Sequence, residues 1–220
     1  PAGPSPPAAS SPGSPPPPTL PAPPLPPGLP PDDGRWLAVS VRAWPGQDRF
    51  FPQLAAFLGH VLAVNPDVHV LLVPMEGEPD RRASEELARH LAGRDVMARV
   101  HVLPADLPVD GIRAVLARCW LAVGMRLHFL IFAAQAGVPV LALNYDPKVA
   151  GVLRRLGAGD FVYDLEGLTA TGLLAGLRAV ERRYDALSQT LRDRSAQLAP
   201  MAAANLDYAD AAALRWGGRV

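Results

Sequence analysis

The sequence predicts an α/β domain of the Rossmann-like type, a doubly wound parallel sheet with helices on both faces. From Trp36 onward, short apolar runs alternate with longer stretches whose apolar residues recur at helical spacing. The runs show almost no alternation of polar and apolar residues, which is typical of strands buried on both faces. Buried strands that alternate with helices indicate a parallel sheet.

Six short runs rich in Val, Leu and Ala are expected to be the strands: 36–41, 68–74, 98–103, 120–124, 138–143 and, most weakly, 160–164. The helical patterns that follow them cover 49–64, 80–91, 109–118, 126–136, 148–156, 169–183 and 186–205. Pro66 ends the first helix, because proline disfavours the helical conformation of the residue before it. The apolar segment 129–143 is too short to cross a membrane and contains Gly137 and Pro139, so helix, turn and strand are expected there.

The first 31 residues hold 16 of the 26 prolines and no charged side chain. Such a segment cannot bury enough apolar surface to offset its ordering entropy. We therefore predict a disordered, proline-rich linker over residues 1–34 and a Rossmann-like domain over 35–220. A ligand for SH3 or WW domains is the alternative function for the proline-rich segment. Because the chain opens on a linker without an initiating Met, we expect another domain to precede it.

The charge and cysteine content of the chain limit the partners and the cellular compartment that can be expected. Lys plus Arg equals Asp plus Glu at 21 each, and the two signs are interspersed, so nucleic acid is not an expected partner. The single cysteine, Cys119, allows no internal disulfide and is predicted to be a core residue of a protein in a reducing, cytoplasmic compartment. His60, His69, His90 and His101 show no metal-ligand spacing, and no metal site is expected.

Three loops are expected to deliver cations to one place. Ligands of open parallel sheets bind outside the carboxyl ends of the strands, where the strand order reverses. With the order 3-2-1-4-5-6, the central loops begin RAWPGQ, GMRLH and NYDPK, so Arg42, Arg126, His128 and Lys148 would share one crevice. Lys148 is the only lysine beside twenty arginines, which suggests a site that needs a compact ammonium rather than a planar guanidinium.

These residues predict a site for a small, multiply charged anion. Both the GMRLH and the NYDPK loop lead into helix starts, whose free N–H groups attract anions. Three further residues of the same two loops are expected to bind the substrate: Gly124, Asn144 and Asp146. No glycine-rich dinucleotide motif and no P-loop is present. Plainer interpretations stay open at this point: a core histidine at 128, a solvated lysine at 148, an ordinary loop arginine at 42, and a helix-capping role for the acids of PMEGEPD.

The segment GMRLHFLIFAAQAGVPVLALNYDPKVAGVLRRLG resembles the polysaccharide pyruvyl transferase family, in particular its S-layer-associated cell-wall type. The similarity extends over about residues 36–205 and includes VSVRAW and LLVPMEGEPD. Family members resemble two-domain GT-B glycosyltransferases. The resemblance therefore implies that this chain is the C-terminal half of such an enzyme, with an N-terminal domain as its partner.

The resemblance also implies a reaction without a cofactor. The family transfers a pyruvyl group from phosphoenolpyruvate to two hydroxyls of a sugar, forming a cyclic ketal. In the cell-wall type the acceptor is N-acetylmannosamine of a lipid-linked polysaccharide, which suggests work at the inner membrane face. His128 and Lys148 match the family's catalytic residues, and Arg126 would support the anion. A general base is expected largely from the other half, with Asp146 or the loop 76–80 as local candidates.

Two other functions remain open from the sequence. The chain has the architecture expected of the nucleotide-binding half of a GT-B glycosyltransferase, in which Asp146 would be the only carboxylate available to hold a ribose. It also fits a non-catalytic, anion-binding module.

Overall fold

The structure is a computed structural model that describes residues 25, 29–30, 34–92 and 96–199. Six parallel strands form one sheet in the order β3-β2-β1-β4-β5-β6, which confirms the predicted α/β class and strand order. The strands are β1 (Arg35–Ser40), β2 (Val68–Leu72), β3 (Val100–Val102), β4 (Cys119–Gly124), β5 (Val140–Asn144) and β6 (Val162–Asp164). Most of the predicted linker and the end of the predicted last helix lie outside the described residues.

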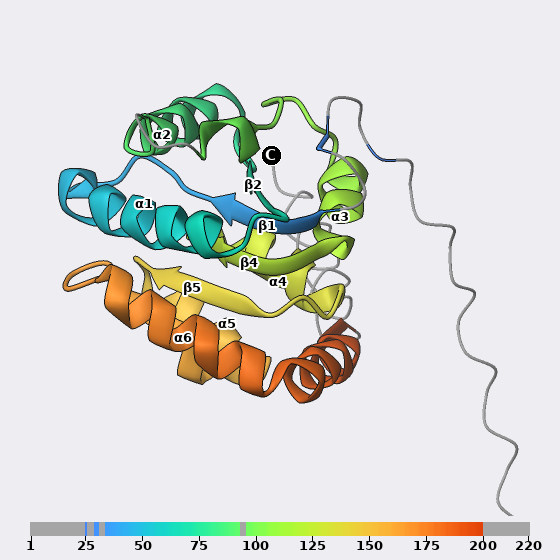
Figure 1. Ribbon diagram of the computed structural model, residues 1–220. Helices are drawn as coiled ribbons and strands as arrows, with labels where there is room; N and C mark the ends of the chain where they lie inside the picture. Colours follow the sequence, from blue (N-terminus) through green and yellow to red (C-terminus); the bar gives the residue numbers. More distant parts are fainter. Residues whose placement is uncertain (1–24, 26–28, 31–33, 93–95, 200–220) are drawn as a thin grey trace, which may run out of the picture.

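Helices cover both faces of the sheet. They are α1 (Gln47–Val64), α2 (Gly77–Arg89), α3 (Val109–Ala117), α4 (Leu127–Gln135), α5 (Pro147–Arg155), α6 (Ala170–Arg182) and a further helix over 184–199. Figure 1 shows α1 and α6 side by side in front of the sheet, with α4 and α5 behind it. The arrowheads of β1 and β5 point the same way, so the loops that leave them meet at one edge.

Several elements differ by a few residues from the sequence-based bounds, and two of these differences have a clear cause. The third strand is shorter, because Met97–Arg99 form a 3-10 turn instead of its first residues. Arg99 holds this turn, since its guanidinium donates to the carbonyls of Leu62, Asn65 and Val68 at 2.7–3.0 Å. Helix α2 begins at Gly77 rather than Asp80, because Pro79 is tolerated in a first turn, where its missing N–H has no partner to lose.

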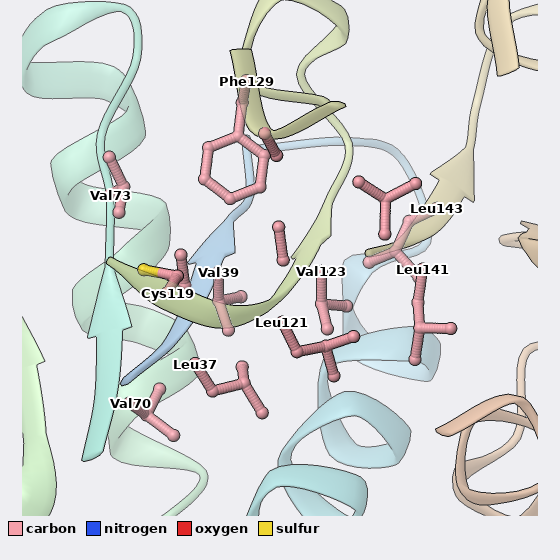
Figure 2. Close-up of a cluster of buried hydrophobic side chains, with 14 of the residues drawn as sticks. Leu37, Val39, Val70, Val73, Cys119, Leu121, Val123, Phe129, Leu141 and Leu143 are labelled. Atoms are coloured by element: carbon pink, nitrogen blue, oxygen red, sulfur yellow. The ribbon is translucent and has the colours of Figure 1, made fainter. Parts of the chain in front are cut away.

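The core lies between the sheet and its helices. Alternate residues of β1, β4 and β5 meet Phe129 of α4 and Cys119 in the cluster drawn in Figure 2. Cys119 is buried, its Sγ donates to the Val115 carbonyl, and burial raises the pKa of its thiol far above the ordinary range, so the predicted core role is confirmed.

The apolar segment 129–143 is part of α4, a turn with Gly137 at φ 74°, and β5. This confirms the prediction of helix, turn and strand. In the described part of the chain, no helix combines the length and apolarity that a membrane crossing requires.

Candidate functional site

The predicted convergence of cations is observed. A crevice of about 690 Å³ opens at the carboxyl edge of the sheet, and its lining includes Arg42, Arg126, His128 and Lys148. These residues follow β1, β4 and β5, the three central strands. The lining also includes apolar side chains, mainly from α3 and α4: Leu107, Val109, Ile112, Leu127 and Phe132.

Arg126 is the most firmly fixed of the four. Its Nε and Nη2 donate to the carboxylate of Asp80 at 2.9 and 2.5 Å, and its Nη1 lies 2.5 Å from Glu76 Oε2. The Arg126 side chain is 14% exposed and that of Asp80 is 1% exposed, whereas Glu76 stands at the rim with 68% exposed. Burial lowers the pKa of Arg126, but the two carboxylates outweigh burial and raise it. The single positive charge of Arg126 is therefore met by two carboxylates within the chain, and its Nη1 contacts the exposed one, Glu76.

Asp80 explains why the loop after β2 belongs to the site. One of its carboxylate oxygens accepts from the backbone N–H groups of Met75 and Glu76, at 3.2 and 3.1 Å. The capping role considered for the PMEGEPD acids takes an unusual form here. Glu76 stands at the start of α2 without a side-chain cap, and Asp80 reaches back to the loop instead.

Arg42 is half-buried and lies beside two aromatic rings. Its guanidinium carbon is 5.4 Å from the ring centre of Trp44 and 5.6 Å from that of Tyr145. Its Nε is buried and has no hydrogen-bond partner among the described residues. A buried N–H without a partner is costly, so this donor is suited to a bound anion. The interpretation of Arg42 as an ordinary exposed loop residue does not fit this position.

His128 is an exposed residue of the first turn of α4, not a core histidine. Its ring centre is 6.3 Å from that of Phe132, and both side chains line the crevice. Arg126 precedes α4 at the N-cap position and makes no side-chain cap, so the free N–H groups of the first turn remain available to an anion.

The start of α5 differs from the expectation. Asp146 caps this helix, accepting from the Lys148 backbone N–H at 2.9 Å, with Pro147 in the first position. We expected both helix starts to attract the anion, but a carboxylate of the chain already occupies this one. The same backbone hydrogen bond, together with the Lys148 charge, lowers the pKa of Asp146, which makes it a weak candidate for the general base.

Lys148 itself is open to solvent. Its side chain is 58% exposed, and Nζ lies 3.4 Å from Asp146 Oδ2 at the mouth of the crevice. This long, exposed contact holds the ammonium only loosely. The Lys148 ammonium can therefore adjust its position to a ligand. It lines the crevice, so it is not simply a solvated surface lysine away from any cavity.

Gly124 does not line the crevice. It is buried, and a Cβ atom there would come within 2.7 Å of the Phe129 ring and 3.3 Å of the Ser40 carbonyl oxygen. The structure gives Gly124 a packing role, since its lack of a side chain lets α4 start directly against the end of β4.

Asn144 and Asp146 lie in a second hollow beside the crevice, of about 520 Å³, which also contains Trp44, Tyr145, Asp164 and Glu166. Tyr145 lines both hollows. The predicted substrate residues are therefore divided between two adjacent hollows. Trp44 and Tyr145 lie in the RAWPGQ and NYDPK loops but were not among the predicted site residues. The signal that could have identified them is the presence of aromatic residues beside the loop cations.

No group of three or more His, Cys, Asp or Glu side chains is arranged to hold a metal ion within residues 34–92 and 96–199.

The solved structures with a similar fold include GT-B glycosyltransferases. The chain is similar to Anabaena HepE in complex with UDP and glucose, with 15% identity and a TM-score of 0.57 over 82% of this chain and 48% of that one. It is similar to the E. coli ADP-heptose LPS heptosyltransferase II, with 15% identity and a TM-score of 0.56 over 72% and 49% of the two chains. At these low identities the similarity concerns the fold alone. This chain matches about half of each structure.

Comparison of the sequence points to a more specific group of proteins than comparison of the fold does. Over 75 residues, the chain is 33% identical to the amylovoran biosynthesis protein AmsJ of Erwinia amylovora, which is 34% of this chain and 18% of that relative. A family model described as polysaccharide pyruvyl transferase matches residues 15–147. The matched segment contains Arg42, Arg126 and His128 and ends one residue before Lys148.

Proposed function

Because this chain belongs to the polysaccharide pyruvyl transferase family, we propose that its crevice binds phosphoenolpyruvate and serves pyruvyl transfer to a sugar. The observation that carries the proposal is the gathering of Arg42, Arg126, His128 and Lys148 around one hollow. Phosphoenolpyruvate bears a carboxylate and a phosphate on three carbons, and cations together with free helix N–H groups are the groups that hold such anions.

The transfer balances without an added reactant. A proton adds to the methylene carbon of phosphoenolpyruvate, and a sugar hydroxyl oxygen bonds to the neighbouring carbon as it becomes electron-poor. The bond from that carbon to the phosphate oxygen breaks, and a second hydroxyl of the same sugar closes the ketal. Of the two hydroxyl protons, one balances the new methyl group and the other leaves on phosphate.

We assign each residue a role in the reaction according to its local environment. His128, exposed at the open start of α4, holds the phosphate as imidazolium or gives the proton to the methylene carbon. Arg42 offers its buried, unpartnered Nε to the anion. Lys148 supplies a movable point charge near the leaving phosphate, where charge grows in the transition state.

Arg126 has a different part in the proposal. Asp80 fixes its guanidinium, and the exposed Glu76 occupies its Nη1. An arriving carboxylate would displace Glu76 toward solvent and take its place on Nη1. In the whole protein, we propose a lipid-linked polysaccharide acceptor at the inner membrane face and a preceding domain that closes over the crevice.

Calorimetric titration of the 220-residue chain tests the proposal. Phosphoenolpyruvate is expected to bind, and Lys148→Met to weaken binding roughly tenfold, which corresponds to about 1.4 kcal/mol. Arg155→Met is the matched control. It removes a cation from the same helix, and Arg155 is exposed and has no hydrogen bond or ion pair within the described residues, so binding should stay within about twofold.

Two results would contradict the proposal. Binding of UDP-glucose without binding of phosphoenolpyruvate would favour the nucleotide half of a glycosyltransferase. Phosphoenolpyruvate binding that is equally strong in Lys148→Met and Arg155→Met would remove Lys148 from the site.

A further inference from the structure

The second hollow has a chemistry unlike that of the crevice. Loops after β1, β5 and β6 form it, and its polar and aromatic lining consists of Trp44, Asn144, Tyr145, Asp146, Asp164 and Glu166. Its lining contains three carboxylates and no Lys, Arg or His, whereas the crevice lining contains Arg42, Arg126, His128 and Lys148 beside one carboxylate, Glu76. We call it the aromatic groove.

Two rings form a platform at the border between the hollows. Trp44 and Tyr145 meet edge to face, with ring centres 4.8 Å apart and planes at 62°. The Arg42 guanidinium lies beside both rings. Both rings are only half-buried, so part of their surface remains free to pack against a ligand. Ring faces carry negative charge density and attract polarised C–H groups.

The polar side of the groove consists of hydrogen-bond acceptors. Asn144 donates to Asp164 at 2.6 Å, and its own Oδ1 is buried and has no partner among the described residues. Glu166 is exposed and forms no hydrogen bond or ion pair in the part of the chain that the structure describes. Carboxylate and carbonyl oxygens of this kind accept from hydroxyl groups.

The combination selects one class of ligand. Asp146 is paired with Lys148, but Asp164 and Glu166 form no ion pair within the described residues. These two carboxylates disfavour phosphates and other anions, so a nucleotide does not suit the groove. A ring with hydroxyls on its edge and C–H groups on its face suits both the acceptors and the platform. A neutral pyranose has this chemistry.

We infer that the aromatic groove is a saccharide subsite in which the sugar ring packs on Trp44 and Tyr145 and its hydroxyls bind Glu166 and Asp164. Its identification as the acceptor site rests on the proposed function. Tyr145 is the common wall of the two hollows, so a sugar in the groove lies next to the crevice that would hold phosphoenolpyruvate.

Saturation-transfer NMR on the 220-residue chain tests the inference. The probes are N-acetylmannosamine and methyl hexopyranosides, each with and without phosphoenolpyruvate. Ring-proton signals are expected in the wild-type chain, with at least a threefold loss in Trp44→Ala and in Glu166→Gln. Glu181→Gln is the matched control, because Glu181 is an exposed carboxylate at the far end of α6, and its signals should equal those of the wild type.

Trp44→Phe guards against misfolding, since it retains an aromatic ring and should retain most of the signal. Thermal unfolding of each variant checks that the fold is intact. Signals that are absent in the wild type, that survive in both groove variants, or that UDP displaces would each overturn the saccharide subsite.

Titration of the same variants with phosphoenolpyruvate separates this inference from the proposed function. Glu166→Gln is expected to bind phosphoenolpyruvate as the wild type does. If phosphoenolpyruvate does not bind but sugar signals still depend on Trp44 and Glu166, the saccharide subsite stands and pyruvyl transfer falls.

Discussion

The loops after β4 and β5 serve the same crevice but are built in opposite ways. Between Gly124 and His128 the chain is tightly packed, with Gly124 against Phe129 and Arg126 against the buried Asp80. Between Asn144 and Lys148 it is open, and the Lys148 ammonium has one long contact. A cation can therefore be placed at a site by rigid pairing or left free to adjust. The two choices differ in what a mutation should cost: folding stability in the first loop, ligand affinity in the second.

The largest effect should come from breaking the rigid pair. Asp80→Ala leaves Arg126 without its main counter-charge and two backbone N–H groups without an acceptor, so a loss of roughly 3 kcal/mol or more in unfolding free energy is expected. Urea unfolding measures it. Glu76→Gln, which touches only the exposed contact, should change the unfolding free energy by less than about 0.5 kcal/mol. Similar losses in both variants would contradict the comparison.

A pair of glycines tests the difference in packing directly. Gly124→Ala forces a Cβ against Phe129 and should cost roughly 1–3 kcal/mol of unfolding free energy. Gly151→Ala, in α5, meets no atom within 4 Å and should stabilise by up to about 1 kcal/mol through helix propensity. Thermal and urea unfolding give both values, and equal signs would contradict the difference in packing between these two positions.

Lys148→Arg sharpens the comparison at the open loop. Stability should change by less than about 0.5 kcal/mol, because the side chain is mostly exposed. Phosphoenolpyruvate affinity should still fall roughly fivefold, since a guanidinium can pair with Asp146 through two hydrogen bonds and is drawn away from the ligand. Calorimetry compares it with Lys148→Met. Full affinity in the arginine variant would show that charge alone matters there.

The smallest effect lies outside both loops, where His69 of β2 and His101 of β3 approach to 3.1 Å. Burial, followed by the charge of His69, lowers the pKa of His101. The unfolded chain then binds the proton more readily, so stability is complete above the ordinary histidine pKa, about 6.5, and declines as pH falls below it. Urea unfolding between pH 7.5 and 5.5 should show this decline, and His101→Gln should reduce it. His60→Gln, at an exposed position of α1, should leave it unchanged.

The sheet could be predicted because buried strands need uninterrupted apolar runs, and the strand order then brings Arg42, Arg126, His128 and Lys148 to one edge. The partner of Arg126 could not be predicted. Asp80 is 46 residues away, and its burial depends on where α2 begins. The aromatic groove could not be predicted because Trp44 follows β1 whereas Asp164 ends β6, and no spacing in the sequence indicates their approach.

The shared position of Tyr145 has a thermodynamic consequence. One ring forms part of the wall of two hollows, so a ligand that fixes its orientation on one side changes the shape offered on the other. Binding on the two sides is then coupled, and linkage makes the coupling reciprocal: whatever factor phosphoenolpyruvate applies to the sugar's dissociation constant, the sugar must apply to that of phosphoenolpyruvate.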